Sequence, residues 1–166
     1  MPKCVGNNST TSLRSIKPPT LADNAKFWGA PNAARAVIWT LLPGAGDGKP
    51  DPYQTLKESV QLGEQKGVRL SHALYAVAAQ ASGDDGKIRE ALKTFAASRS
   101  EEKPVNPQFK LVDSMAKNMV QGISDRYWTE HTGIRTSDEG MQRFWDDKED
   151  TAELDDLFNE EVTAQS

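Results

Sequence analysis

FKLVDSMAKNMVQGISDRY, residues 109–127, is the stretch of the chain that decides the fold. Its apolar side chains follow one another in steps of three and four residues, which is the spacing of one face of an α-helix. A helix of about 20 residues spans on the order of 30 Å, long enough to form the spine of a bundle. The apolar positions of this stretch are Phe109, Val112, Ala116, Met119, Val120, Ile123 and Tyr127.

Several shorter helices are predicted before this stretch. Pro31 fits the first turn of a helix that ends at Pro43, Ser71 is a candidate N-cap, and Asp84 or Asp85 is a second one. Because no segment shows sustained alternation of apolar and polar residues, we expect no sheet. The predicted fold class is all-α, a helical bundle of about five to seven helices. The apolar faces expected in these helices are Ala34, Val37, Ile38 and Leu41; Tyr53, Leu56 and Val60; Leu74, Val77, Ala78 and Ala81; and Ile88, Ala91, Leu92 and Phe95. A further short helix is expected over residues 21–28.

The two ends of the chain differ from its middle in composition. Residues 1–20 are rich in Asn, Ser, Thr and Pro and cannot bury enough apolar surface to fold alone, so we expect a flexible polar arm. Residues 21–135 are expected to form the helical body, and residues 136–166 an acidic helical tail. In the tail, Thr136 and Glu139 form the capping-box pattern of a helix. The apolar side chains expected there are Met141, Phe144 and Trp145, followed on an amphipathic helix from Thr151 by Leu154, Leu157, Phe158 and Val162.

The net charge of −4 conceals an asymmetry between tail and body. Residues 138–161 hold eleven acidic side chains against Arg143 and Lys148, a net charge of −9, so the rest of the chain carries +5. Such a tail could shield the basic surface of the body, mimic a polyanion or dock on a basic partner. A solvated acidic face is the alternative interpretation.

Length and composition restrict the class of protein. A chain of 166 residues suits one domain with a hydrophobic core, and its lone cysteine, Cys4, cannot form an intramolecular disulfide. The first residues lack the apolar core of a signal peptide, and the longest apolar stretch, residues 33–42, contains Arg35. We therefore expect no membrane span, and a place in the cytoplasm or in a virion assembled there.

No motif predicts a catalytic, cofactor-binding or metal-binding residue. Residues 82–88, SGDDGKI, would offer a calcium ion too few oxygen ligands, and His72 and His131 have no partner at ligand spacing. Glu58 begins a Glu-Ser pair of the kind that opens a lytic transglycosylase motif, but a general acid needs an apolar pocket and Glu58 stands among charged residues. An enzyme is therefore less expected than a binding protein, and we predict no cofactor.

A basic residue followed by two aromatic residues occurs three times, at irregular intervals. Adjacent side chains on a helix diverge by about 100°, so one ring of each pair could lie near the surface. The rings either join the helices to one another or form exposed anchors for a protein partner, in which Trp, Tyr and Arg contribute most of the binding energy. The residues proposed for partner binding are Phe27 and Trp28 (after Lys26), Arg126, Tyr127 and Trp128, Arg143, Phe144 and Trp145, and, in the tail, Leu154, Leu157 and Phe158.

Three functions remain open at this point. The first is a non-enzymatic protein–protein interaction or assembly protein, as an oligomer or with another protein, by architectural analogy a structural or accessory subunit of a virion or phage. The second is a nucleic-acid-binding regulator in which the acidic tail competes with the nucleic acid. The third is a helical cell-wall lytic enzyme that uses Glu58.

Overall fold

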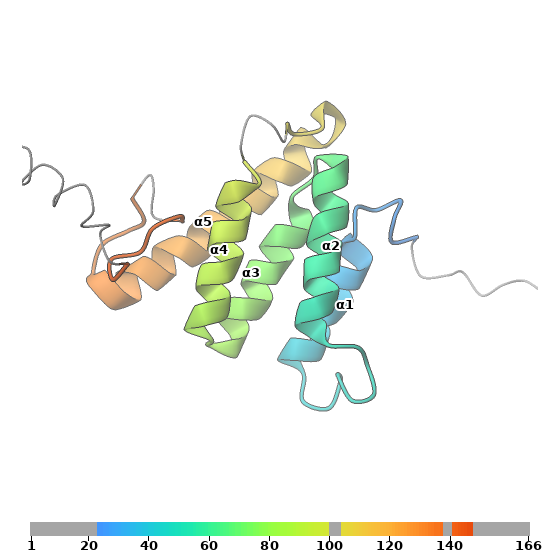
Figure 1. Cartoon of the computed structure of the whole chain (residues 1–166), viewed down its shortest axis with the longest axis horizontal. Helices are drawn as coiled ribbons and strands as arrows, with labels where there is room; N and C mark the ends of the chain where they lie inside the picture. Colours follow the sequence, from blue (N-terminus) through green and yellow to red (C-terminus); the bar gives the residue numbers. More distant parts are fainter. Residues whose placement is uncertain (1–22, 100–103, 138–140, 148–166) are drawn as a thin grey trace, which may run out of the picture.

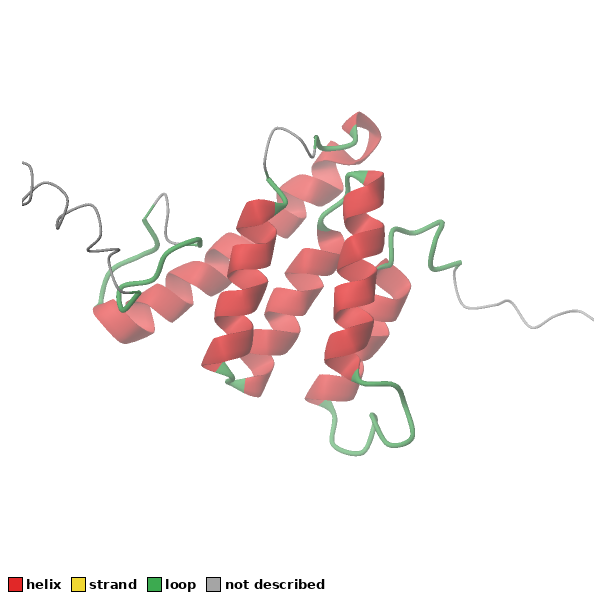
Figure 2. Ribbon diagram, viewed as in Figure 1, coloured by secondary structure: helices red, strands yellow, loops and turns green. Residues whose placement is uncertain are grey.

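The computed structural model describes residues 23–99, 104–137 and 141–147. Within these residues all regular structure is helical and no strand occurs, which confirms the predicted all-α class (Figure 1, Figure 2). The predicted arm over residues 1–20 and the predicted helix from Thr151 lie outside the described residues. The elements are α1 (Ala30–Leu41), α2 (Pro52–Lys66), α3 (Leu70–Ser82), α4 (Asp85–Ala97), the 3-10 turn η1 (Pro107–Phe109) and α5 (Lys110–Thr132).

Helix α3 is the centre of the bundle. It packs against α1, α2, α4 and α5, whereas α1 and α5 do not contact each other. In Figure 1, α2 and α4 lie in front, and α1, α3 and α5 lie behind them. Small side chains allow the neighbouring helices to approach α3 closely. The buried alanines of α3 are Ala73, Ala76, Ala78 and Ala79.

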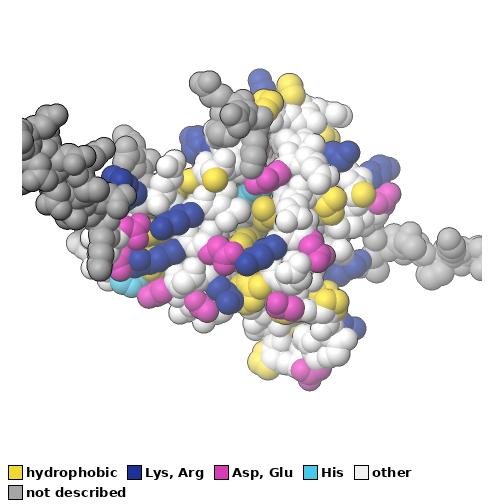
Figure 3. Space-filling view, viewed as in Figure 1, with side chains coloured by type: hydrophobic (Ala, Val, Ile, Leu, Met, Phe, Trp, Pro, Cys, Tyr) yellow, Lys and Arg dark blue, Asp and Glu magenta, His cyan; other side chains and the backbone are white. Residues whose placement is uncertain are grey.

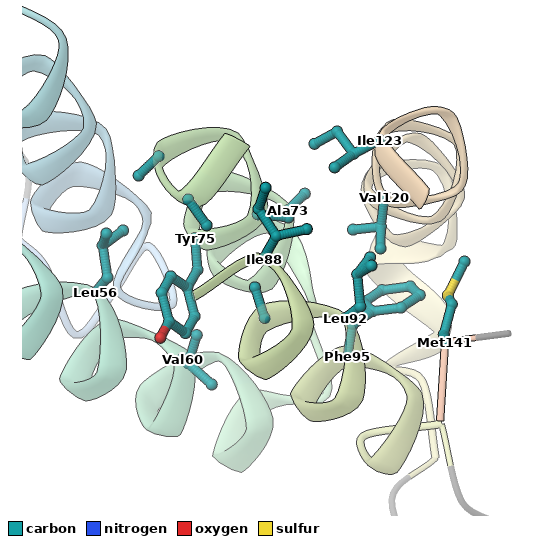
Figure 4. Packing of buried hydrophobic residues seen from close by; sticks show 14 of the residues in the cluster. Leu56, Val60, Ala73, Tyr75, Ile88, Leu92, Phe95, Val120, Ile123 and Met141 are labelled. Atoms are coloured by element: carbon teal, nitrogen blue, oxygen red, sulfur yellow. The ribbon is translucent and has the colours of Figure 1, made fainter. Parts of the chain in front are cut away.

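Larger side chains fill the space around these alanines (Figure 4). Leu56 and Val60 of α2 lie beside Tyr75 of α3, and all three are buried. On the other side of α3, the core continues through α4 and α5 to the segment that follows α5. The residues of this second part include Ile88, Leu92 and Phe95 of α4, Val120 and Ile123 of α5, and Met141.

Local signals set several helix boundaries as predicted. Pro31 lies in the first turn of α1, where its missing N–H group costs nothing. The Asp84 carboxylate accepts a hydrogen bond from the Lys87 backbone N–H (3.1 Å), so Asp84 is the cap of α4. Helix α2 begins in the same way after Asp51, and it ends at Gly67, whose φ of 68° is the left-handed conformation that glycine adopts readily.

Three predictions near the start of the chain are wrong. Residues 24–29 form turns rather than the end of a helix. Ser71 lies inside α3, not at its N-cap, and its buried hydroxyl donates to the Trp28 carbonyl (3.1 Å). The predicted apolar face of α1 is right for Val37, which is buried, but wrong for the rest, because α1 also buries Ala33 and Ala36 and leaves Ile38 and Leu41 about half exposed.

The predicted helix after Thr136 is also wrong within the described residues. Residues 136–137 and 141–147 contain turns, a bend and irregular backbone, and the Thr136 hydroxyl donates to the Ser124 hydroxyl (2.8 Å). A helix would separate adjacent side chains by about 100°. The observed backbone instead lets both Phe144 and Trp145 pack against Tyr127.

Helix α5 confirms the long helix predicted from residues 109–127, although it is not the spine of the bundle. It has 23 residues, and its buried positions include Ala116, Val120 and Ile123. Met119, expected in the core, is 37% exposed. The central position belongs to the shorter, alanine-rich α3.

A buried guanidinium ties three helices together at one end of the bundle. Arg69, at the start of α3, is 5% exposed. Its Nε and Nη2 donate to the Ser98 carbonyl at the end of α4 (3.0 and 2.6 Å), and its Nη1 lies 2.9 Å from an Asp113 carboxylate oxygen in the first turn of α5. A buried charge is tolerated only where its hydrogen bonds are made, so these contacts fix where α5 begins relative to α3 and α4.

We expect Arg69→Met to lower the free energy of unfolding by about 3–5 kcal/mol, because it leaves the Asp113 carboxylate and the Ser98 carbonyl without their buried donor. Urea unfolding followed by circular dichroism measures the change. Lys57→Met is the control, since it breaks an exposed ion pair with Glu90 (2.7 Å) and should cost less than about 1 kcal/mol. Equal losses in the two variants would contradict the role of Arg69.

Gly29 is required where α1 meets α2. Its φ is 79°, and a Cβ atom there would lie 2.5 Å from the Ser59 carbonyl oxygen. Gly83 has a similar φ of 64° but open space around it. We therefore expect Gly29→Ala to destabilise the fold clearly more than Gly83→Ala, which carries only the backbone cost of about 1 kcal/mol. Thermal unfolding of both variants compares the two costs, and equal values would exclude a steric role for Gly29.

Candidate protein-binding surface

Two of the three basic–aromatic motifs come together at the C-terminal end of α5. Tyr127 and Trp128 lie on the last turns of α5, and Phe144 and Trp145 reach them from the segment 141–147. Ring centroids of Trp128 and Trp145 are 5.2 Å apart in an edge-to-face arrangement, and those of Tyr127 and Phe144 are 5.9 Å apart. Such pairs add stability beyond the area they bury.

Arg89 of α4 completes this aromatic cluster. Its guanidinium lies 4.8 Å from the Phe144 ring and 5.1 Å from the Trp145 ring, and its Nε donates to the Tyr127 hydroxyl (2.9 Å). The same guanidinium forms an ion pair with Asp146 (2.7 Å). Segment 141–147 is therefore held to the body by cation–π contacts and an ion pair at once.

Neighbouring groups also lower the pKa values of the two carboxylates of this segment. The hydrogen bond from Arg89 lowers the pKa of Asp146 below its usual range. The backbone N–H of Phe144 donates to Asp147 (3.0 Å) and lowers the pKa of that carboxylate. Both side chains thus favour their charged forms at neutral pH.

The aromatic candidates of these two motifs are buried or half-buried, whereas their arginines are exposed. Tyr127, Trp128 and Phe144 are buried, and Trp145 is half-buried. Arg126 and Arg143 are exposed. The rings therefore join the chain segments to one another, which is the structural alternative considered from the sequence. The remaining tail candidates, Leu154, Leu157 and Phe158, lie outside the described residues.

The third motif lies elsewhere, at the start of α1. Trp28 packs against Phe109 with ring centroids 4.4 Å apart, and its backbone adopts φ 54°, a conformation that a bulky residue rarely takes. The hydrogen bond from Ser71 to the Trp28 carbonyl helps to hold this conformation. Phe27, beside it, is 39% exposed. The structure therefore separates this motif from the other two.

Helix α3 has one apolar stripe that is less deeply buried than its other sides, and two residues of this stripe, Leu74 and Val77, pack partly against the core. His72 packs toward Phe95 of α4, and Tyr75 packs toward Tyr53 of α2. At about 100° per residue, the side of α3 opposite these two contacts carries positions 70, 74, 77 and 81. Leu70, Leu74 and Val77 are half-buried and Ala81 is exposed, although residues 71–73, 75–76 and 78–79 are all buried.

Helix α1 leaves apolar side chains exposed on the same side of the bundle. Gly29 abuts Ser59 of α2. Ile38 follows Gly29 by nine residues, about two and a half turns, and so projects from the side of α1 opposite α2. Ile38 and Leu41 are each 49% exposed.

Helix α5 also leaves apolar side chains exposed. Asp113 faces the end of α4 through Arg69, and Met115 and Met119 lie about 200° and 240° further round the helix. Their side chains therefore point away from α4, and they are 56% and 37% exposed.

The stripe of α3 and these side chains of α1 and α5 all lie on the side of the bundle away from α2 and α4. We call this surface the open face: Ile38 and Leu41 of α1, Leu70, Leu74 and Val77 of α3, and Met115 and Met119 of α5.

The opposite side of the bundle has a different chemistry. There, over α2 and α4, basic and acidic side chains lie interspersed (Figure 3). Lys57 of α2 pairs with Glu90 of α4 at 2.7 Å, and Lys87 pairs with Asp84 at 3.5 Å. A mixed-charge surface is well solvated, whereas adjoining exposed apolar residues mark interaction sites. The open face is therefore the candidate binding surface.

A hollow of about 340 Å³ lies where α3 ends, α4 begins and α5 passes. Its wall includes Arg126, Glu130 and His131 of α5 and Asp85 of α4. The His131 Nδ1 lies 2.8 Å from the Tyr127 carbonyl, and its Nε2 lies 3.9 Å from Asp85. Charges of both signs line the hollow beside the last turns of α5.

The residues considered for chemistry have structural surroundings. Glu58 is exposed on α2 and accepts a hydrogen bond from Gln54 (3.0 Å). The buried His72 lies 3.2 Å from Glu64, and His131 stacks on Trp145. Within the described ranges, no group of three or more His, Cys, Asp or Glu side chains is placed to hold a metal ion.

The sequence did not reveal the open face, for reasons that the structure explains. Leu74 and Val77 belong to the apolar face predicted for α3, and the structure shows them half-buried against the core. Because α3 has apolar residues on every side, periodicity cannot show which side is most deeply covered. Met119 has the same sequence spacing as the buried residues of α5, but its own side chain is 37% exposed. The signal available was the excess of apolar residues on α5, where Leu111 and Met115 stand apart from the core spacing.

The fold and this surface define an all-α protein with an apolar open face. Comparison of the chain with protein-family models, with curated proteins and with solved structures gave no match. None of the described helices has both the length and the apolar character that crossing a membrane requires.

We expect segment 141–147 to stay attached from neutral pH down to about pH 4 and to loosen below it. A carboxylate with a lowered pKa stabilises the folded state above its usual pKa, and this stability is lost as the pH falls through the lowered value. Both Asp146 and Asp147 are of this kind. The indole N–H resonance of Trp145 in an NMR pH titration reports the change, and Arg89→Gln should move it to higher pH. A midpoint above about pH 6 would contradict a role of the two carboxylates.

Proposed function

We propose that the chain is a non-enzymatic protein-interaction module that binds an amphipathic helix of a partner protein on the open face. The observation that supports this function is the shared direction of the incompletely buried apolar side chains on three adjacent helices. A single exposed apolar residue is ordinary, but a row on α3 bordered by further apolar residues on α1 and α5 is the chemistry of a helix-binding surface.

The side chains of the open face suit an extended apolar contact. Leu70, Leu74 and Val77 follow one another along α3 in steps of four and three, and a partner helix with apolar residues at similar spacing can pack along them. Met115 and Met119 border this row with flexible side chains, which adapt to the shape of the partner. The partner should therefore present leucine, isoleucine or an aromatic residue every three or four positions.

The same chemistry favours a protein partner over nucleic acid. Nucleic-acid binding depends on basic side chains that neutralise phosphates, and on exposed rings where single strands stack. The open face is formed by aliphatic side chains and methionines, and Tyr127, Trp128 and Phe144 are buried in the aromatic cluster. The assignment of the chain to a virion or phage particle assembled in the cytoplasm stays a prediction from the sequence.

Met119→Asp tests the proposed function. We expect it to weaken capture of the partner from the native source at least about tenfold, because it places a charge in the apolar contact. Ile134→Asp is the matched control, since Ile134 is 63% exposed beyond the end of α5 and is not one of the open-face residues. The measurement is the amount of the same bound protein, identified by mass spectrometry, at equal bait concentration.

Circular dichroism and thermal unfolding must show that both variants keep the fold. A partner captured equally by wild type, Met119→Asp and Ile134→Asp would contradict binding at the open face. A partner lost only in Ile134→Asp would move the binding site to the end of α5.

A further inference from the structure

Two of the four methionines of the chain lie together on the open face. Met115 and Met119 are about one turn apart on α5, and side chains four positions apart on a helix are neighbours, with Cβ atoms about 6 Å from each other. Met115 is 56% exposed and Met119 is 37% exposed. Small solutes in water can therefore reach both side chains.

A third methionine, Met141, has different surroundings. It is 8% exposed and belongs to the core that α4 and α5 share with segment 141–147 (Figure 4). Met115 and Met119 are not part of this buried core. The fold therefore needs an apolar side chain at position 141, whereas a more polar one at position 115 or 119 changes mainly the surface.

Exposure makes these two methionines the reactive ones toward a hydroperoxide. The methionine sulfur donates an electron pair to one oxygen atom of hydrogen peroxide and becomes a sulfoxide, and the other oxygen leaves as water. The sulfur is oxidised by two electrons and the peroxide is reduced by two, so no further reactant is required. Because the peroxide must reach the sulfur, Met115 and Met119 are expected to react before Met141.

The oxidised side chain no longer suits an apolar contact. A methionine thioether is flexible and apolar, whereas a sulfoxide is polar and disrupts methionine-rich interfaces. Burying the sulfoxide oxygen against an aliphatic partner removes its water without supplying a hydrogen-bond donor, which weakens binding. The residues of the α3 row do not undergo this reaction, so the sensitivity of the open face is confined to α5. These residues are Leu70, Leu74 and Val77.

We propose that Met115 and Met119 form a reversible oxidation switch: hydroperoxides convert them to sulfoxides, and the oxidised open face no longer binds the partner helix. The inference rests on the proposed function, because it names a modification that regulates the same surface. Methionine sulfoxide reductases return the sulfoxide to the thioether and thereby restore the apolar contact. A bound partner covers both side chains, so the switch acts on the free chain.

The first measurement is the position and rate of oxidation. Every variant carries Cys4→Ser, because a thiol also reacts with peroxide. In the folded chain treated with dilute hydrogen peroxide, peptide mass spectrometry should find Met141 oxidised at least about fivefold more slowly than Met115 and Met119. In urea the three should react at similar rates. Equal rates in the folded chain would overturn the assignment of the site.

The second measurement uses a dye, 8-anilinonaphthalene-1-sulfonate, as a probe of exposed apolar surface. Oxidation limited to Met115 and Met119 should lower its fluorescence on the folded chain at least about twofold, because the dye binds apolar surface. The thermal unfolding temperature should stay that of the untreated chain, since neither side chain belongs to the buried core. The matched control is Met115→Leu with Met119→Leu, which keeps the apolar area and should bind the dye equally before and after peroxide.

Partner capture tests the consequence for binding. Capture from the native source should fall at least about tenfold after oxidation of both methionines, and it should return after treatment with methionine sulfoxide reductases of both stereospecificities. The double leucine variant should capture the same protein before and after peroxide. Equal loss in that variant would assign the effect to another residue and would overturn the switch.

Failure of the switch can be distinguished from failure of the proposed function. Capture that is lost in Met119→Asp but unchanged by complete oxidation of Met115 and Met119 would overturn the switch and leave the binding surface standing. Capture that Met119→Asp leaves unchanged would contradict the binding surface itself, and the switch with it.

Discussion

The hydrogen bonds of the buried Arg69 guanidinium are the constraint on which the arrangement of the bundle depends. They join the start of α3, the end of α4 and the first turn of α5 at one point. Because Asp113, in the first turn of α5, is held beside the end of α4, α5 packs on α3 and also contacts α4. Helix α1 meets α3 on the far side, and the stripe between α1 and α5 stays less deeply buried. A charge buried for structural reasons thus determines where the apolar surface is left open.

The alanines of α3 explain how one short helix can contact four others. A helix lined with large side chains holds its neighbours further away, whereas Ala73, Ala76, Ala78 and Ala79 let them approach until larger residues interlock around it. The apolar residues that α3 turns to the open face are of a different size, two leucines and a valine at half-buried positions. These half-buried residues therefore extend the core toward the surface and offer apolar area to a binding partner.

Sequence reasoning predicted the features that local chemistry controls. The long helix α5, the cap at Asp84 and the proline at the start of α1 follow from residues within a few positions of one another. The clamp at Arg69 joins residues 29 and 44 positions apart, and no local pattern indicates it. Segment 141–147 was predicted as a helix because Thr136 and Glu139 match a capping box, but packing of two adjacent rings on Tyr127 requires a different backbone. Tertiary contacts therefore decided both the open face and the segment that ends beside it.

The aromatic cluster and the open face have separate roles that the chain connects. Tyr127, Phe144 and Arg89 hold Asp147 at the end of α5, and none of them belongs to the open face. The cluster instead sets the path of the chain after α5, because Phe144 and Trp145 pack on Tyr127 while Asp146 pairs with Arg89. A charge-assisted contact and three ring contacts thus decide the backbone of segment 141–147, where local sequence alone predicts a helix.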